Sequence, residues 1–171
     1  QAPPTGRRAA IIGSGPAGLT AAIRLAAHGH DVTIFEAENK LGGMLRYGIP
    51  EFRLPKSILD RYTVLIKKAG IHLRLNTAIG TSLAIPDLFR DGYDAVFIAT
   101  GLWRARPLNV PGESLPNVCY GIHYLASPES FDIGKRVAVI GTGNTAMDVA
   151  RTAIHGGADY VTLYARRAQS A

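Results

Sequence analysis

Residues 9–18 read Ala9-Ala-Ile-Ile-Gly13-Ser-Gly15-Pro-Ala-Gly18, a short apolar run that ends in a glycine-rich turn. An amphipathic stretch follows at residues 17–27 and ends before Gly29, and a second apolar run covers residues 31–36. Buried runs of this length on either side of a helical period predict a strand, a helix and a second strand. This stretch therefore predicts an α/β fold built around a parallel sheet.

The spacing of the glycines indicates a nucleotide-binding turn. Gly13 permits the tight turn, Gly15 lets the backbone approach a diphosphate, and Gly18 lets the helix pack closely on the strand. The positive end of the helix then faces the phosphates. Glu36 ends the second strand, where its carboxylate can accept ribose hydroxyl protons and would repel a 2′-phosphate. The alternative interpretation is a glycine-rich turn without a ligand, and the surrounding strand, helix and acid argue against it.

The same pattern recurs later in the chain. A strand is expected over residues 136–140, a helix over 145–155 and a strand over 160–164, with Gly141-Thr-Gly143-Asn-Thr-Ala146 at the first turn. This second copy ends in Arg166 and Arg167, whose guanidinium groups can hold a 2′-phosphate, so NADPH is favoured over NADH. A solvated basic strand end remains the alternative. Asp148 is expected to order the helix start or a neighbouring arginine, without a catalytic role.

These two copies predict the domain organisation. We expect a flexible leader at residues 1–8, a first nucleotide-binding domain at 9–112, a proline-rich linker at 113–134, and the first βαβ unit of a second domain at 135–171. Residues 93–99 are expected to form a buried strand within the first domain. The predicted fold class is α/β, a Rossmann-like domain with three-layer ββα features followed by the start of a second Rossmann-like unit.

Composition excludes several classes of protein. The formal charge of +6 comes from scattered basic residues without interleaved aromatics, which argues against a nucleic-acid surface. No apolar run approaches the roughly 18 residues that cross a bilayer, so we expect a cytoplasmic protein without a membrane partner. The single cysteine, Cys119, cannot ligate an iron–sulfur cluster or form the cysteine pair of disulfide reductases. The five histidines lack metal-binding spacing, so no metal site is expected.

Three stretches together resemble one known family. They are Gly42-Gly-Met-Leu-Arg-Tyr-Gly-Ile-Pro-Glu-Phe-Arg-Leu-Pro-Lys56, Asp94-Ala-Val-Phe-Ile-Ala-Thr-Gly101 and Gly141-Thr-Gly-Asn-Thr-Ala-Met-Asp148. They are similar to the NADPH-dependent glutamate synthase small-subunit family, which also includes the flavin halves of dihydropyrimidine dehydrogenase and of electron-bifurcating transhydrogenases. The resemblance covers the chain from Ala9 onward. Adrenodoxin-reductase-like enzymes share the helix start at residues 143–151 and are a near relative.

The resemblance implies where two cofactors bind. FAD would lie on the first glycine turn and under the loop at residues 42–43, residues 100–101 would close over it, and NADP(H) would dock on the second turn. Family members usually carry a cysteine-rich cluster domain, a complete NADPH domain and a C-terminal segment that contacts the flavin, none of which this sequence contains. The implied FAD-binding residues are Gly13, Gly15, Pro16, Ala17, Gly18, Glu36, Ala37, Gly43, Met44, Leu45, Arg46, Thr100 and Gly101. The implied NADP(H)-binding residues are Gly141, Gly143, Asn144, Thr145, Ala146, Arg166 and Arg167.

The expected function is an FAD-dependent oxidoreductase that passes hydride from NADPH to FAD and electrons onward to an iron–sulfur protein or a larger oxidoreductase subunit. Hydride transfer between such cofactors needs no protein acid or base, so no catalytic side chain is expected. The alternative is a non-catalytic flavin- or nucleotide-binding module that serves as a structural subunit of a larger complex. A third interpretation is that the sequence represents one segment of a longer enzyme.

Overall fold

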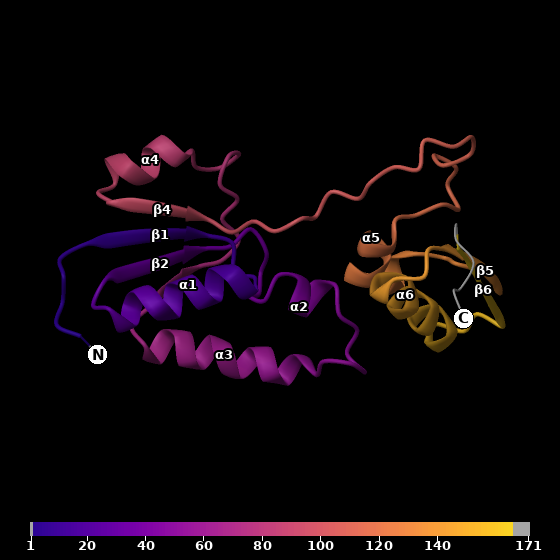
Figure 1. The fold of residues 1–171 in the computed structure, drawn as a ribbon, viewed down its shortest axis with the longest axis horizontal. Helices are drawn as coiled ribbons and strands as arrows, with labels where there is room; N and C mark the ends of the chain where they lie inside the picture. The colour runs from indigo at the N-terminus through magenta and orange to yellow at the C-terminus, as the bar shows by residue number, and fades with distance from the viewer. Residues whose placement is uncertain (1, 166–171) are drawn as a thin grey trace. The chain divides into compact units, whose positions relative to one another are not determined.

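The computed structural model describes residues 2–165, which form two compact units (Figure 1). Unit 1 comprises the chain up to Arg46 and the stretch Leu54–Gly101. Unit 2 comprises the stretch Tyr47–Arg53 and the chain from Leu102 onward. The chain therefore passes into unit 2 for seven residues, returns to unit 1, and enters unit 2 again after Gly101.

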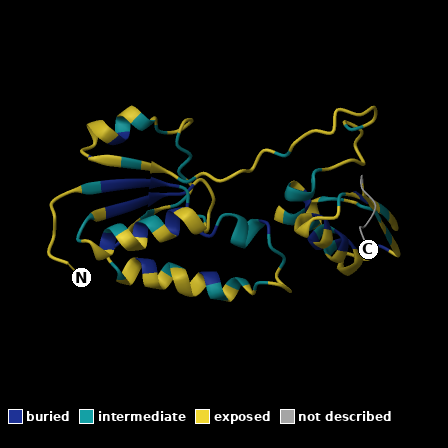
Figure 2. Ribbon diagram, in the orientation of Figure 1, coloured by how far each residue is buried: buried dark blue, intermediate teal, exposed yellow. Residues whose placement is uncertain are grey.

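Unit 1 contains a parallel sheet of four strands in the order β3-β2-β1-β4. The central pair is in register from Arg8 opposite Asp31 to Ile12 opposite Phe35. Both central strands are buried almost throughout, as Figure 2 shows, because the sheet is covered on both faces. The strands are β1 (Arg8–Ile12), β2 (Asp31–Phe35), β3 (His72–Arg74) and β4 (Ala95–Ile98).

Two apolar cores lie on opposite faces of this sheet, because successive strand side chains alternate between faces. Ile11 and Ile34 pack with side chains of α1 (Pro16–Ala27) and α3 (Lys56–Lys68) on one face. Ile12 and Phe35 pack with Leu88 of α4 (Ile85–Arg90) on the other face. Helix, sheet and helix layers thus build unit 1. A short helix, α2 (Met44–Tyr47), follows the loop that covers the carboxyl end of β1.

Unit 2 repeats the strand–helix–strand arrangement of β1, α1 and β2 in unit 1. β5 (Arg136–Ile140) and β6 (Tyr160–Tyr164) pair in parallel, and α6 (Asn144–His155) connects them. Val139, Ala146 and Ala150 form the buried cluster between this sheet and α6. The preceding helix α5 (Gly121–Ala126) packs on α6, and a 3₁₀ turn follows it (Pro128–Ser130). A Cβ placed on Gly121 would lie 2.9 Å from Cγ2 of Val149, so the absent side chain permits this close approach.

The α/β Rossmann-like fold with a parallel sheet is confirmed, and the strands expected over residues 136–140 and 160–164 lie where they were predicted. The expectation that residues 93–99 are buried is wrong for most of β4. Phe97 is 46% exposed and Ile98 61% exposed. β4 is the edge strand of the described sheet, so its outer side lacks a neighbour. Within residues 2–165 no helix is both long and apolar enough to span a bilayer.

Three segment assignments differ from the sequence-based expectation. The predicted flexible leader is held by hydrogen bonds, such as Thr5 N–H to Gly29 O at 2.9 Å, and β1 already begins at Arg8. The predicted linker at 113–134 contains α5, which packs on α6. Unit 2 begins again at Leu102, ahead of the expected boundary after residue 112, and it also includes residues 47–53. The packing of α5 on α6 and the pairing of Arg53 with Asp148 join residues 121–126 and 47–53 to unit 2, and both contacts are long-range and invisible in the local sequence.

Candidate functional site

The first glycine turn joins β1 to α1 at the carboxyl edge of the sheet. The Gly13 N–H donates to the Phe35 carbonyl at 2.8 Å, which locks the turn to the end of β2. Gly13 has a φ of 101°, a conformation that favours glycine. Gly15 occupies the N-cap position of α1, and no side-chain hydrogen bond caps the helix there. The first-turn N–H groups of α1 therefore remain available to an anion.

Glu36 lies directly beneath this turn and is 7% exposed. Its Oε2 accepts a hydrogen bond from the Ser14 N–H at 2.8 Å and a short one from the Ser14 hydroxyl. Its Oε1 accepts from the Glu38 N–H at 3.0 Å. A carboxylate has about four acceptor sites, so Oε1 can accept one further hydrogen bond, for instance from a ribose hydroxyl. Sequence reasoning missed Ser14, which stands between two glycines and whose role appears only through this contact.

Two other segments lie close to the first turn. A Cβ on Gly43 would lie 2.8 Å from the Gly15 Cα, and the Gly42 N–H donates to the Ser14 carbonyl at 3.1 Å. A Cβ on Gly13 would overlap the Ala99 carbonyl, and Thr100 and Gly101 follow it directly. The structure thus brings Gly13, Gly15, Gly43 and the start of the Thr100-Gly101 segment together at one edge of the sheet. Pro16, Ala17 and Ala37 are exposed there, and Gly18 is buried against Gly13.

The short helix α2 carries the next three predicted residues, Met44, Leu45 and Arg46, all of them half-buried. The Arg46 side chain is 7% exposed, and it donates to the Leu41 carbonyl and to Asp60, each at 2.7 Å. Its guanidinium therefore fixes the loop to α3. The Lys56 ammonium holds the Leu45 carbonyl at 3.0 Å. The Arg46 charge is thus engaged by groups of unit 1 and is not directed at a ligand.

The second glycine turn has the same hydrogen-bonding geometry. The Gly141 N–H donates to the Tyr164 carbonyl at 2.9 Å, as Gly13 does to the end of β2. Gly143 is the N-cap of α6, and again no side chain caps the helix. Asn144 and Thr145 are exposed at the start of α6, whereas Ala146 is buried in the position that Gly18 holds in the first turn. The turn therefore presents backbone N–H groups and two polar side chains to solvent.

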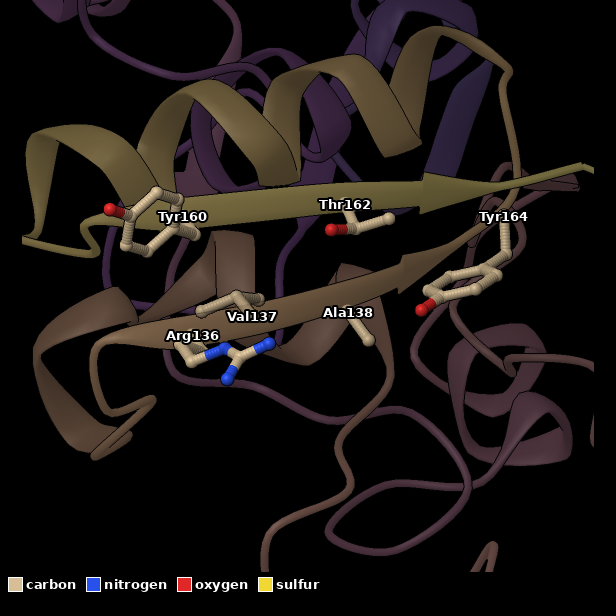
Figure 3. Close-up of a pocket in the computed structure, with 6 residues that line it drawn as sticks. All are labelled: Arg136, Val137, Ala138, Tyr160, Thr162 and Tyr164. Atoms are coloured by element: carbon tan, nitrogen blue, oxygen red, sulfur yellow. The ribbon is translucent and has the colours of Figure 1, made fainter.

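The residue that follows the carboxyl end of β6 differs from the one that follows β2. Ala165 follows β6 where Glu36 follows β2, so among the described residues the position that Glu36 holds beneath the first turn carries no carboxylate in the second. Arg166 and Arg167, predicted to contact a 2′-phosphate, lie outside the described residues. A hollow of about 510 Å³ lies over β5 and β6, with Arg136, Tyr160, Thr162 and Tyr164 among its lining (Figure 3). It contains no residue of the glycine turn.

Asp148 lies in the second turn of α6 and is buried, with a side chain 6% exposed. The Arg53 guanidinium donates to its Oδ1 at 2.8 Å and to its Oδ2 at 2.6 Å. This pairing confirms the expectation that Asp148 orders a neighbouring arginine. The hydrogen bond to Asp148, together with the charge attraction, raises the pKa of Arg53. Local sequence does not indicate which arginine pairs with Asp148, because 95 positions separate the two.

The described residues contain one free thiol and no cluster of metal-ligating side chains. Among residues 2–165, no three histidine, cysteine, aspartate or glutamate side chains gather into a metal-binding group. Cys119 is a free, exposed thiol, and partial burial raises its pKa, which lowers its reactivity at neutral pH. Each unit therefore offers one candidate site, a backbone turn with its supporting side chains.

Residues 7–170 match the model of the pyridine nucleotide-disulphide oxidoreductase family. The chain belongs to this family. Among curated members and relatives, it is 46% identical to the beta subunit of an NADP(+)-dependent formate dehydrogenase from Moorella thermoacetica, over 97% of this chain and 24% of that protein. It is 38% identical to the small chain of an NADPH glutamate synthase from Azospirillum brasilense, over 92% of this chain and 36% of that protein.

A solved oxidoreductase structure is also similar to this chain. FprA of Mycobacterium tuberculosis, solved in complex with NADPH, superposes with a TM-score of 0.71 at 31% identity, over 85% of this chain and 36% of that one. The chain thus spans about a quarter to two fifths of the length of the relatives it matches. It is an oxidoreductase domain of an FAD- and NAD(P)-dependent family, related to glutamate synthase small chains. The resemblance drawn from the sequence is confirmed at this level.

Proposed function

We propose that this chain takes part in hydride transfer from NADPH, bound at the Gly141–Ala146 turn, to FAD, bound at the Gly13–Gly18 turn. The observation that supports it is the pair of matching turns, each with an uncapped helix N-terminus and a first glycine tied to the neighbouring strand. Uncapped helix starts of this kind bind diphosphate groups through backbone N–H donors. Two such turns in one chain favour two dinucleotides.

The residues present fit both cofactors. A Cβ added at Gly15 or at Gly143 would meet no atom within 4 Å, so the space above each turn is open. Both glycines also have ordinary negative φ angles, −68° and −78°. Their lack of a side chain is therefore not required by packing or backbone conformation. Close approach of a ligand to the backbone explains it.

Each side chain of the site has a separate task in this proposal. Glu36 would accept a hydrogen bond from a ribose hydroxyl of FAD at the remaining acceptor site of Oε1, while Ser14 holds the carboxylate in place. Asn144 and Thr145 would flank the diphosphate of NADP(H), and Arg166 and Arg167 would hold its 2′-phosphate. When bound, flavin and nicotinamide supply the redox chemistry themselves, so the protein's part is to bind, orient and shield them.

The acceptor of the electrons is proposed from the relatives. The Moorella protein is named as a beta subunit, and so is an NADPH-Fe(3+) oxidoreductase subunit from Geobacter sulfurreducens that is 38% identical. We therefore expect electrons to leave this chain for an iron–sulfur or other acceptor on a larger oxidoreductase subunit. A cytoplasmic location accords with this proposal.

The proposal is tested with two alanine variants that should fold normally. Gly15→Ala adds a methyl group in the path of FAD, and Gly143→Ala adds one in the path of NADPH, each into open space. Flavin content and NADPH affinity are measured for each variant, together with bleaching of the flavin absorption by NADPH under anaerobic conditions. Each variant should lose affinity for its own cofactor on the order of tenfold, because a hydrogen bond to a charged group contributes ~1.5–3 kcal/mol.

The outcome separates the two functions that the sequence leaves open. A yellow chain that bleaches with NADPH, with each variant affecting one cofactor, supports the oxidoreductase. A chain that binds flavin but does not bleach supports a structural flavin module. Loss of neither cofactor in the variants would overturn the assignment of these turns.

A further inference from the structure

The seven residues Tyr47–Arg53 leave unit 1 and belong to unit 2. Both flanks of this segment are held in unit 1. Arg46 on one side pairs with Asp60, and Lys56 on the other side holds the Leu45 carbonyl. Residues 47–53 thus form a strap whose two flanks are anchored in unit 1.

The strap contacts one face of α6 through its last two residues. Arg53 donates to both carboxylate oxygens of Asp148. The Phe52 ring lies 4.9 Å from the His155 ring, and the Arg151 guanidinium lies 4.6 Å above the same Phe52 ring. Positions 148, 151 and 155 are three and four residues apart, so they share one face of the helix. The contacts therefore extend from the second turn of α6 to its last residue.

Burial makes this contact consequential for the helix. Asp148 is almost inaccessible to solvent, whereas Arg53 is 41% exposed. A buried carboxylate that loses its partner is strongly unfavourable, much more so than an exposed one. Because Arg53 remains charged at any pH that the protein tolerates, it can pair with Asp148 permanently. α6 consequently depends on the strap for the neutralisation of a charge in its second turn.

We propose that Arg53 and Phe52 are positioning residues for the nicotinamide-nucleotide turn, acting through Asp148 and Arg151 of α6. This inference rests on the proposed function. Gly143 is the N-cap of α6, and the first-turn N–H groups of this helix would hold the diphosphate, so the depth and rotation of α6 determine where those donors point. Displacement of a donor by a fraction of an ångström weakens a charge-assisted hydrogen bond. The strap holds the helix from a segment that precedes it by almost a hundred residues.

The chain offers a matched set of variants. Arg53→Ala removes the partner and leaves the Asp148 charge buried. Arg53→Lys restores a charge without the planar guanidinium, and Arg53→Ala with Asp148→Asn removes both charges. Arg61→Ala is the control, since Arg61 is an exposed arginine of α3 in unit 1. For each FAD-loaded variant of the 171-residue chain, NADPH affinity, flavin content and the rate of flavin reduction at saturating NADPH are measured.

Arg53→Ala should weaken NADPH binding roughly tenfold, as expected for loss of hydrogen bonds to a charged group, while flavin content and the saturated reduction rate stay within about twofold. Arg53→Lys and the double variant should each recover part of the affinity, because neither leaves an uncompensated buried charge. A purely structural role would instead lower flavin content and the reduction rate together with affinity. That result, or an unchanged affinity in Arg53→Ala, would overturn the inference.

A second measurement separates this inference from the proposed function. Amide hydrogen exchange of α6 is compared between the wild-type chain and Arg53→Ala without nucleotide. If the wild-type chain binds no NADPH, the proposed function fails, and faster exchange of α6 in the variant still supports the positioning of α6 by the strap. Unchanged exchange would overturn it. If Arg53→Ala does not fold, Phe52→Leu is used in its place, with a smaller loss of affinity expected.

Discussion

The two glycine turns of this chain have the same backbone geometry but are stabilised in different ways. In unit 1, β1 has strands on both sides and the buried Glu36 holds Ser14 from beneath the turn. In unit 2, β5 pairs within the described residues only with β6, and Ala165 takes the place of the acid. There the helix is held from outside by the strap. The backbone of the turn is thus a local property, whereas its support comes from wherever the tertiary structure provides it.

The largest expected difference concerns the third position of the motif. Gly18→Ala places a Cβ onto the Gly13 carbonyl oxygen, a backbone atom that cannot move without disrupting the turn. We expect unit 1 to lose about 3 kcal/mol or more of stability, as for severe overpacking. Ala146→Gly, the reverse change in unit 2, should cost only about 1 kcal/mol through the lower helix propensity of glycine. Hydrogen exchange of α1 and α6 measures each loss, and equal losses would contradict the comparison.

Next in size is the effect of Glu36→Gln. The Glu36 carboxylate accepts hydrogen bonds from the Ser14 and Glu38 N–H groups. The amide of glutamine would point its own N–H group at one of these donors, so that a buried donor would lose its acceptor. We expect a loss of about 1–3 kcal/mol from unit 1 and weaker FAD binding. Ser14→Ala removes only the hydroxyl and should cost about 1 kcal/mol. Thermal unfolding followed with flavin release checks both, and a larger effect of Ser14→Ala would show that the hydroxyl, not the carboxylate, dominates.

Ala165→Glu would make the second turn resemble the first. A carboxylate after β6 would accept hydrogen bonds from ribose hydroxyls and repel a 2′-phosphate, as Glu36 is expected to do. The ratio of NADPH to NADH affinity should fall on the order of tenfold, the size of one hydrogen bond to a charged group. Titration with both nucleotides measures it. An unchanged ratio would argue that the residue after β6 does not face the ribose.

The smallest expected effect is on pH dependence, and here the two units should behave alike. Hydrogen bonds from the Arg8 N–H and Arg7 lower the pKa of Asp94 in unit 1. Hydrogen bonds from the Leu108 and Asn109 N–H groups and Tyr120 lower the pKa of Glu113 in unit 2. A depressed pKa means that the folded state favours the charged carboxylate, so its contribution is present above the ordinary values of 3.8 and 4.5 and is lost on further acidification.

Asp94→Asn and Glu113→Gln test this directly. Each variant should melt slightly below the wild type at neutral pH, and the difference should vanish in acid. The shift should be small, because both carboxylates face solvent and such interactions are screened. A difference that grows on acidification would have the wrong sign and would contradict this assignment. Melting curves recorded across the acidic range provide the measurement.

Local sequence determined the elements and the shape of both turns. The short apolar runs fix the central strands of unit 1, and the glycines at 13, 15 and 18 fix a turn that few other residues allow. These preferences act between neighbours along the chain, through sterics and hydrogen bonds of short period. They are therefore readable from residues 9–36 without any knowledge of the rest.

Only the tertiary structure decided what supports those elements. The pairing of Arg53 with Asp148 joins residues 95 positions apart, and nothing in either local sequence selects the other. The exposure of Phe97 on β4 likewise depends on which strands lie beside it, not on its own apolar character. The contact of Glu36 with Ser14 depends on β1 and β2 lying in register. Each follows from long-range packing, which a local pattern constrains but does not specify.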